Sequence, residues 1–261
     1  SIQYTVTAGA GQTIWSRTST NDGGAWSAWT NSNSTSGTLT LNSLANGTTY
    51  EVQLGLAVSP AEPTTLLSGT ASGTPATTPG APATVTGTGK DGYVALSWSV
   101  PASTGGSPIL GYRVEVSTAV GGPWTAAEGS CAPDVTIDNT ATSCDATGLT
   151  DGTPYYFRVA AQNAIGLGST ITSSAVTPVG VPDTPDAPTG DGSVNQITIS
   201  WTAPGTHGSA ITGYRLQRAT SDLGPYANIG SGACVAATVN LSTATSCVDT
   251  DVVADTNYYY K

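Results

Sequence analysis

The pattern of apolar and polar positions predicts short strands and no long helix. No window repeats apolar residues at i, i+3, i+4 and i+7 over three turns, the spacing that an amphipathic helix requires. Instead, β-branched and aromatic runs alternate with polar residues, as in residues 112–116 and 155–159, so that one face of each strand is buried and the other is wet. Gly, Asn, Asp and Pro punctuate these runs. We therefore expect an all-β chain.

An internal repeat organises the chain. Residues 143–159 combine Leu149, an Asp-Gly turn and Tyr155 with an alternating strand, and weaker copies occupy residues 44–50 and 247–260. Tyr112 and Tyr214 are 102 residues apart, and four further pairs are 103 residues apart: Trp98 and Trp201, Cys131 and Cys234, Cys144 and Cys247, and Tyr155 and Tyr258. Two homologous copies of about 100 residues, each long enough for one small two-layer core, account for these spacings.

Three units follow from this repeat. We expect unit one at residues 1–77, a diverged copy without cysteines, unit two at 78–179 and unit three at 180–261. Proline-rich stretches at 74–82 and 177–188 separate them. Because proline fixes its own backbone and favours extended conformations before it, such linkers are stiff spacers that hold the units roughly end to end.

Units two and three share a further set of residues at matching positions. These are Pro82 and Pro188, Trp98 and Trp201, residues 111–113 and 213–215 (Gly-Tyr-Arg), residues 122–124 and 224–226 (Gly-Pro-aromatic), and the Leu-to-Tyr corner. On these residues, the two units resemble fibronectin type III domains. The resemblance implies seven strands in a two-sheet sandwich and a corner tyrosine whose hydroxyl bonds to nearby backbone. The fold class is then three immunoglobulin-like β-sandwiches in tandem, the first and last incomplete.

The two ends depart from the family pattern. Residues 2–6 are interpreted as the second strand of unit one, so its first strand is missing, and unit three stops within its sixth strand. Such sandwiches expose an unpaired edge. Either the chain is an excerpt of a longer array, or neighbouring subunits supply the missing strands by β-augmentation.

The four cysteines predict two disulfides. Four cysteines allow three pairings, and the repeat symmetry selects Cys131–Cys144 and Cys234–Cys247. A loop of this size stabilises a fold by about 3 kcal/mol. The alternatives are free buried thiols or a metal site, but a metal needs further ligands and the chain has one histidine. Disulfides indicate an extracellular location, secreted or at the cell surface.

Charge and composition argue against several partners. Seven Lys and Arg residues, scattered singly, oppose 17 Asp and Glu, for a net charge of −10. Nucleic acid and anionic membrane surfaces require clustered cations, so neither is expected as a partner. No apolar run approaches the roughly 18–20 residues needed for membrane insertion.

Two features that suggest chemistry have simpler interpretations. Residues 87–92 match G-x-G-x-x-G, but a strand follows where a dinucleotide site needs a helix, so we interpret them as a turn, repeated at 190–192. His207, the only histidine, lies in a loop with no paired carboxylate or serine motif and is interpreted as a solvated residue. We therefore expect no catalytic residue, no cofactor and no metal.

Trp26 and Trp29 are the surface candidates for ligand contact. On a strand, two residues three apart lie on opposite faces, so one indole would pack inward and the other could stack on a sugar or a partner. Alternatively, Trp26 covers the core, as Trp124 should, and Trp29 covers a neighbouring strand. Glycosylation is a further candidate at the N-x-[ST] sequons of Asn33, Asn46 and Asn240.

Together these features predict a non-catalytic extracellular structural protein, a segment of a cell-surface stalk, spacer or fibre. In one form of this hypothesis, copies of the chain assemble by strand complementation. Its partners would be neighbouring domains or copies of itself. The alternative is an adhesive or carbohydrate-binding accessory module of a secreted protein or polysaccharide-degrading enzyme, with glycans or surface proteins as partners.

Overall fold

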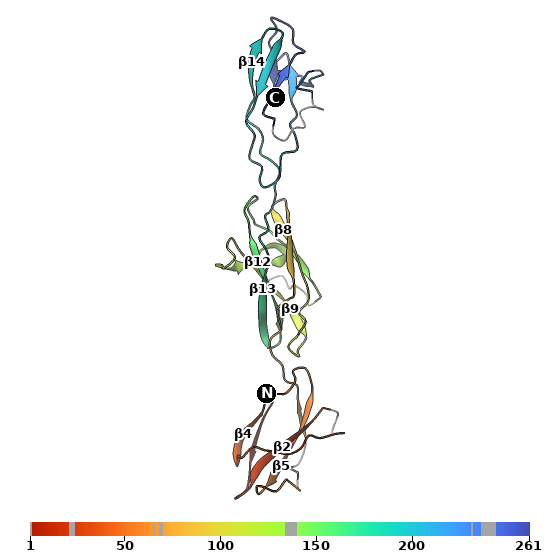
Figure 1. Cartoon of the computed structure of the whole chain (residues 1–261), viewed down its shortest axis with the longest axis vertical. Helices are drawn as coiled ribbons and strands as arrows, with labels where there is room; N and C mark the ends of the chain where they lie inside the picture. The colour runs from red at the N-terminus through yellow and green to blue at the C-terminus, as the bar shows by residue number, and fades with distance from the viewer. Residues whose placement is uncertain are drawn as a thin grey trace.

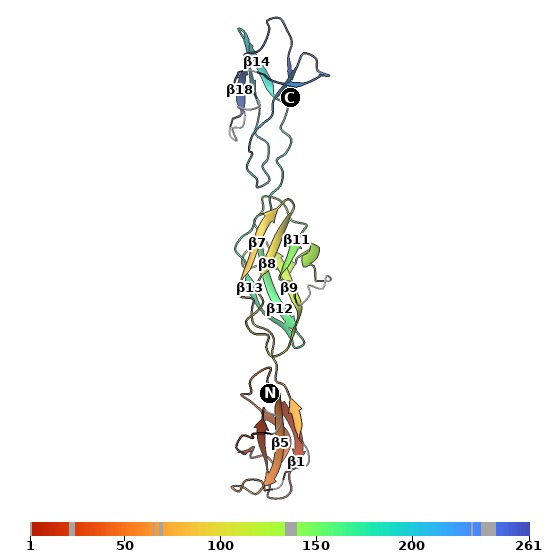
Figure 2. The same cartoon turned by 90° about the vertical axis from the view of Figure 1, so that its right-hand side faces the viewer.

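The computed structural model describes residues 2–20, 24–64, 66–67, 70–133, 140–230, 232–235 and 244–261. The three units follow one another along a single long axis, and a narrow waist separates each pair in both views (Figures 1 and 2). The described residues form 19 strands and one 3-10 turn, η1 (Gly129–Cys131). The expectation of tandem β-sandwiches is thereby confirmed.

Unit one contains two antiparallel sheets. β1 (Ile2–Thr7) pairs with β4 (Ser36–Leu41), and the second sheet has the order β3-β2-β5-β6. Its buried core includes Ile14, Trp15, Val52 and Ala57, which come from the two central strands of the second sheet. The strands of that sheet are β2 (Thr13–Ser19), β3 (Thr30–Asn31), β5 (Tyr50–Ala57) and β6 (Ala71–Gly73).

Unit two is a seven-stranded sandwich with the sheet orders β11-β8-β7 and β10-β9-β12-β13. Alternation on β9 and β12 directs Val114, Phe157 and Val159 inward, where they pack with Val94 from the facing sheet. The strands are β7 (Val85–Lys90), β8 (Tyr93–Trp98), β9 (Ile109–Ser117), β10 (Thr125–Ala126), β11 (Ser143–Ala146), β12 (Tyr156–Asn163) and β13 (Gly166–Thr172).

Unit three repeats this pairing in shorter strands, with the sheet orders β14-β15-β18 and β17-β16-β19. The registers correspond: Cys144 lies opposite Leu96 in unit two, and Cys247 lies opposite Ile199 in unit three. The strands are β14 (Thr189–Ser193), β15 (Gln196–Ser200), β16 (Gln217–Ala219), β17 (Ala227–Asn228), β18 (Ser246–Asp249) and β19 (Tyr259–Tyr260).

Unit three differs from unit two at one place in the core. Three apolar residues of unit two, Ala146, Val116 and Phe157, correspond by register to Asp249, Arg218 and Tyr260. The Asp249 carboxylate is fully buried, lies 2.9 Å from an Arg218 nitrogen and accepts a hydrogen bond from the Tyr260 hydroxyl at 3.0 Å. A polar cluster therefore replaces an apolar one at the same strand positions.

The interpretation of residues 87–92 as a turn is wrong in part. Gly87 and Gly89 belong to β7, and only Asp91 and Gly92 form the turn to β8. A Cβ built on Gly89 would lie 1.9 Å from the carbonyl oxygen of Thr177, so glycine lets the linker pass against this strand. Residues 190–192 likewise lie in β14 and not in a turn.

The corner tyrosines form the expected bonds. The Tyr155 hydroxyl accepts the Thr150 N–H at 3.1 Å, and those of Tyr50 and Tyr258 each accept the N–H five residues upstream, at 3.0 Å. The bond is the same in all three units, including the diverged unit one. Each tyrosine thereby fixes the chain where it crosses between the sheets.

Candidate functional site

Both predicted disulfides are present in the structure. Cys131 is bonded to Cys144 and Cys234 to Cys247, with Cα–Cα distances of 5.2 Å in each case. All four side chains are buried, and each bond joins the end of a short loop to a core strand, β11 or β18. Each disulfide therefore fixes a loop within its own unit and does not link one unit to the next.

Backbone hydrogen bonds hold unit one to unit two at a contact that we call joint one. The Gly47 amide of the corner turn donates to Pro75 at 2.8 Å, which ties the linker to unit one. On the other side, Thr77 donates to Gly105 at 2.8 Å and Gly80 donates to Ser103 at 2.9 Å, which ties the same linker to unit two. The linker is thus bonded to both units.

Joint two, between units two and three, repeats this arrangement. Gly152 donates to Pro178 at 2.9 Å, Gly180 to the His207 carbonyl at 2.7 Å and Asp183 to Gly205 at 3.0 Å. The linker positions are those of joint one displaced by 103 residues. Because backbone groups make all of these bonds, side-chain patterns alone do not reveal them. The only indication of the joints in the sequence is that the two linkers are 103 residues apart, like the repeat itself.

One linker–loop contact, Thr77 with Gly105 in joint one and Gly180 with His207 in joint two, has its glycine on opposite sides in the two joints. A Cβ on Gly105 would lie 2.2 Å from the Thr77 carbonyl oxygen, so in joint one the loop carries the glycine. In joint two the loop residue is His207, with φ +46°, and the linker residue is Gly180. A Cβ on Gly180 would lie 3.1 Å from the His207 Cβ and 2.4 Å from a carboxylate oxygen of Asp151.

The imidazole of His207 has a partner. Its Nε2 lies 2.9 Å from Asp183 Oδ1, and the two side chains are 42% and 61% exposed. The hydrogen bond and charge of Asp183, with a smaller contribution from the charge of Asp151, raise the pKa of His207, against a lowering by desolvation. His207 lies in a loop, as predicted, but it belongs to joint two and is not simply a solvated side chain.

Asn163 reinforces joint one from within unit two. The side chain is 1% exposed, and its Nδ2 donates to the carbonyls of Thr77, on the linker, and Thr104, in the adjacent loop, at 2.7 and 2.8 Å. Both protons of the amide are thereby used. Asn163 could not be predicted from the sequence, because one asparagine in a strand has no distinguishing pattern.

The prediction for Trp26 and Trp29 is wrong in its geometry. These residues precede β3 in irregular backbone, so they do not alternate across a strand. Instead both half-buried indoles stack on one cation: the Arg17 guanidinium lies 5.1 Å from the Trp26 ring centroid and 4.7 Å from that of Trp29. Arg17 also donates to Gln53 of the neighbouring strand at 2.7 and 2.9 Å.

The same device recurs in the other units. Arg158 lies 4.8 Å from the Trp124 ring centroid and 2.5 Å from buried Glu115, and Lys261 lies 4.2 Å from the ring of Tyr226. Trp124 therefore stacks on a cation and does not cover the core. The cation lies on different strands in units one and two. In unit two, Arg158 of β12 pairs with Glu115 of β9. In unit one, the cation is Arg17 of β2, the counterpart of β9, and it pairs with Gln53 of β5.

The structure describes two of the three sequon asparagines. Asn33 is exposed, with φ +55°, and Asn46 is exposed at joint one, where a Cβ on Gly106 would lie 2.7 Å from the Asn46 carbonyl carbon. Asn240 lies outside the described residues. Glycosylation at these asparagines stays a prediction.

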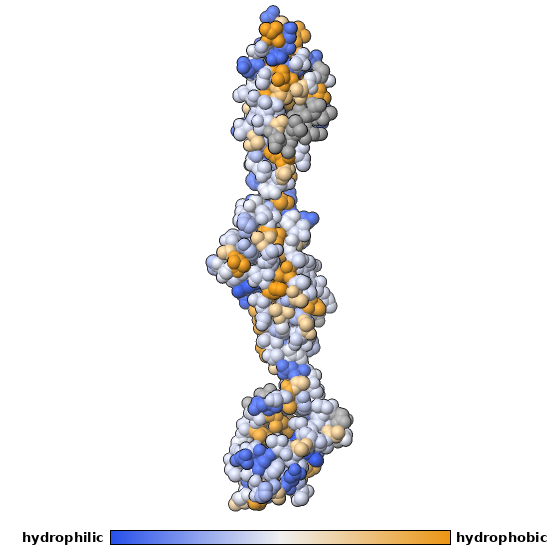
Figure 3. Space-filling view, in the orientation of Figure 1, coloured by the Kyte–Doolittle hydropathy of each residue, from blue (hydrophilic) through white to orange (hydrophobic). Residues whose placement is uncertain are grey.

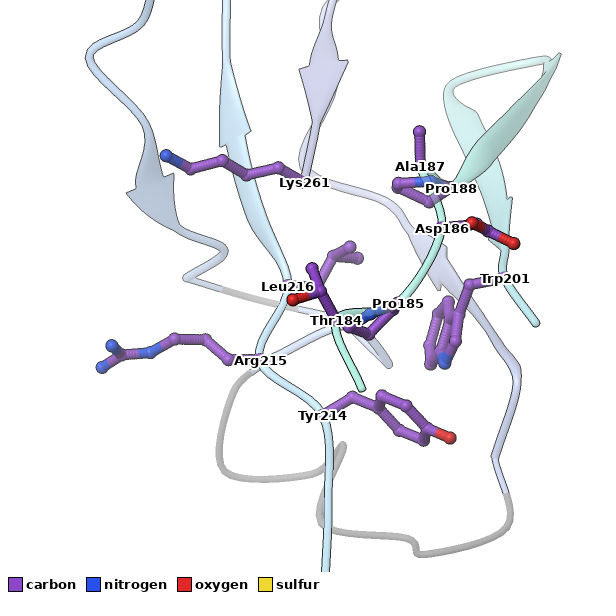
Figure 4. A pocket seen from close by; sticks show the side chains of 10 residues that line it. All are labelled: Thr184, Pro185, Asp186, Ala187, Pro188, Trp201, Tyr214, Arg215, Leu216 and Lys261. Atoms are coloured by element: carbon purple, nitrogen blue, oxygen red, sulfur yellow. The ribbon is translucent and has the colours of Figure 1, made fainter. Parts of the chain in front are cut away.

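One hollow in unit three lies beside a pair of aromatic rings (Figure 4). Trp201 and Tyr214 pack at 5.2 Å between centroids, close to the 5.3 Å of Trp98 and Tyr112 in the core of unit two. The corresponding pair is core packing in unit two, so the rings alone do not identify a ligand site. Residues 184–188, 214–216 and Lys261 complete the lining.

On the face shown in Figure 3, apolar residues are scattered among polar ones. Within the described residues, no group of three or more His, Cys, Asp or Glu is placed to hold a metal ion. No helix in that part of the chain has the length and apolar character to span a membrane.

Comparison with protein families identifies a known domain in unit two. Residues 79–178 match the sequence model of the family described as "Fibronectin type III domain". Myosin-binding protein H of Gallus gallus is 39% identical over 82 residues, which cover 31% of this chain and 14% of that protein. Protein sidekick-1 of Gallus gallus is 33% identical over 174 residues, which cover 63% of this chain and 7% of that protein. The chain thus spans only a small part of these relatives.

A solved structure of the chicken CNTN1 FN1-FN3 domains aligns with 95% of this chain and 81% of its own, at 15% identity and a TM-score of 0.37. The family match confirms the resemblance found in the sequence for unit two. Unit three repeats the strand register, the disulfide and the corner tyrosine of that unit.

Proposed function

Because the chain is built of tandem fibronectin type III domains, we propose that it is an extracellular, non-catalytic spacer that separates its two ends by a fixed distance. The observation that carries this proposal is the repetition of the joints. Two linkers, 103 residues apart, bond to the units on either side through the same backbone groups. A linker bonded to both neighbours resists bending, which a spacer requires.

The proposed domains are residues 1–77, 78–179 and 180–261, with the boundaries in the proline-rich linkers. The similar proteins support a non-catalytic structural or adhesion module. The two disulfides support an extracellular location, since such bonds persist in oxidising surroundings. The partners are neighbouring domains and surface proteins.

Small-angle X-ray scattering on the full chain tests the spacer proposal. Three units end to end are expected to give a maximum dimension on the order of 100 Å with a rod-like distance distribution. The control is a variant in which residues 178–183 are replaced by a Gly-Ser sequence of equal length, which is flexible. The proposal is refuted if the native chain shows the same broad distribution as this variant.

Assembly through strand pairing is the finer form of the proposal. β1 pairs with β4 alone among the described residues, whereas its counterpart β8 lies between two strands. Sedimentation velocity over a wide concentration range measures such assembly. A monodisperse monomer at all concentrations would exclude it and leave the spacer proposal intact.

The carbohydrate-binding alternative also has a direct test. Arg17 already stacks on both indoles, which is a structural role for Trp26 and Trp29 that needs no ligand. A glycan array with the native chain and Trp29→Ala distinguishes the two roles. Binding lost in the variant would support the alternative, and no binding by the native chain would remove it.

A further inference from the structure

The two joints share their backbone geometry but differ in charge. Three uncharged residues of joint one, Asn46, Gly80 and Gly105, correspond to three titratable residues of joint two, which are Asp151, Asp183 and His207. Each of the three lies at or beside a backbone group that makes the joint. The difference is therefore concentrated at the contact between units two and three.

These three side chains come from different parts of joint two. Asp151 belongs to the corner turn of unit two, Asp183 to the linker and His207 to a loop of unit three. Asp151 is itself oriented, because its Oδ1 accepts the Gly92 N–H at 3.0 Å. The absence of a Cβ at Gly180 leaves the space in which the Asp151 carboxylate and the His207 Cβ approach the linker.

We propose that joint two is a proton-operated hinge, in which protonated His207, bonded to the Asp183 carboxylate and attracted by that of Asp151, fastens unit three to unit two. The carboxylates of Asp183 and Asp151 are the charged groups that act on this imidazole. When His207 loses its proton, the attraction between opposite charges disappears, but the backbone bonds and a neutral N–H donor at Nε2 can remain. Joint two then opens more often, while joint one, which has no such groups at these three positions, does not respond.

The direction of the effect follows from the contacts of His207. Its hydrogen bond with Asp183 and the two negative charges raise the pKa of the imidazole in the closed joint. A group whose pKa is raised in the closed state stabilises that state fully below its ordinary value, about 6.5, and loses the effect as the pH rises through the raised pKa. Joint two is therefore tightest in mild acid and looser in alkali.

Hydrogen exchange measures this opening at single amides. The Gly180 and Asp183 amides report on joint two, and the corresponding Thr77 and Gly80 amides report on joint one in the same molecule. After correction for intrinsic rates, we expect the ratio of joint-two to joint-one protection to fall about two- to fivefold from mild acid to about pH 9, as for one exposed ion pair. A ratio that stays constant with pH would overturn the proposal.

Two variants separate titration of His207 from other causes. His207→Asn removes the ionisable group and tolerates the positive φ, so its protection ratio should not vary with pH. Asp151→Asn restores the residue type of joint one and should reduce the change. A native pH profile in His207→Asn would overturn the proposal, even if the spacer proposal still held. High salt should weaken the native response, because both side chains are exposed to screening.

Discussion

The buried carboxylate of Asp249 should hold unit three together through its partners. Asp249 is 0% exposed, and its two oxygens accept bonds from Arg218 at 2.9 Å, from the Tyr260 hydroxyl at 3.0 Å and from the Asp251 N–H at 3.0 Å. Asp249→Ala removes both acceptor oxygens, and with them all three bonds, at once. Arg218, whose side chain is 19% exposed, then keeps its bonds to Asp251 and its stacking on the Tyr258 ring, 4.9 Å from the ring centroid.

The expected cost of Asp249→Ala is about 3–5 kcal/mol, the usual cost of removing one partner from a buried ion pair. The lower end of that range is the better estimate here, since Asp251 still neutralises the guanidinium at 3.2 Å. The Tyr260 hydroxyl also loses its acceptor. Hydroxyl and guanidinium are both left without the buried charge that compensated their desolvation.

Unit two supplies the matched control. Its residues at the same register positions are Ala146, Val116 and Phe157, so the triple variant Asp249→Ala, Arg218→Val, Tyr260→Phe installs the apolar cluster of unit two in unit three. Replacing a whole buried ionic cluster with apolar residues is often neutral or stabilising by about 1–4 kcal/mol. The triple variant should therefore recover most of the stability that the single variant loses.

Native-state hydrogen exchange in the full chain measures both effects. The opening free energies of the β18 amides report on unit three, and those of β11 in unit two serve as the internal reference. A change of less than about 1 kcal/mol in the β18 values of Asp249→Ala would contradict the role of Asp249 as a buried partner. A triple variant no more stable than the single one would contradict it as well.

Three further predictions concern the other structural devices. Tyr155→Phe removes the acceptor of the Thr150 N–H and should cost unit two about 1 kcal/mol in urea unfolding, whereas Tyr156→Phe, at a neighbouring hydroxyl, should cost less. The double variant Cys131→Ala, Cys144→Ala should lose about 3 kcal/mol from unit two and leave the exchange of unit three unchanged; equal losses in both units would contradict a disulfide that acts within its own unit. Asn163→Ala leaves the Thr77 and Thr104 carbonyls without the amide donor and should lower protection of the Thr77 amide by about 1–3 kcal/mol, with joint two as the unaffected reference.

The strands could be predicted from the sequence because they depend on local patterns, and the repeat and the disulfides because the same residue types recur at a fixed spacing. Alternation over residues 112–116 and 155–159 follows from burial of one strand face, and the spacing of 103 residues selects the cysteine pairs. The tyrosine corner followed from family resemblance, and the three hydroxyl bonds confirm it.

The candidate sites could not be predicted because they depend on contacts between distant residues. The strand interpretation of Trp26 and Trp29 failed because the chain before β3 is irregular and the cation that both rings share, Arg17, lies on another strand. The joints depend on backbone donors, which every residue except proline carries. Nothing in the local sequence of Gly80 or Asp183 distinguishes such a donor from any other.

The opposite placement of the glycines in the two joints limits how these domains can be recombined. A chimera that joins the first linker to unit three would place a threonine against His207, and its Cβ would lie 2.4 Å from the Asp151 carboxylate if the corner of unit two is kept. The reverse chimera would place Gly180 against Gly105, with no clash but with two of the least restrained residues face to face. A linker and the domain that follows it should therefore be exchanged together, with the junction of the chimera placed before the linker.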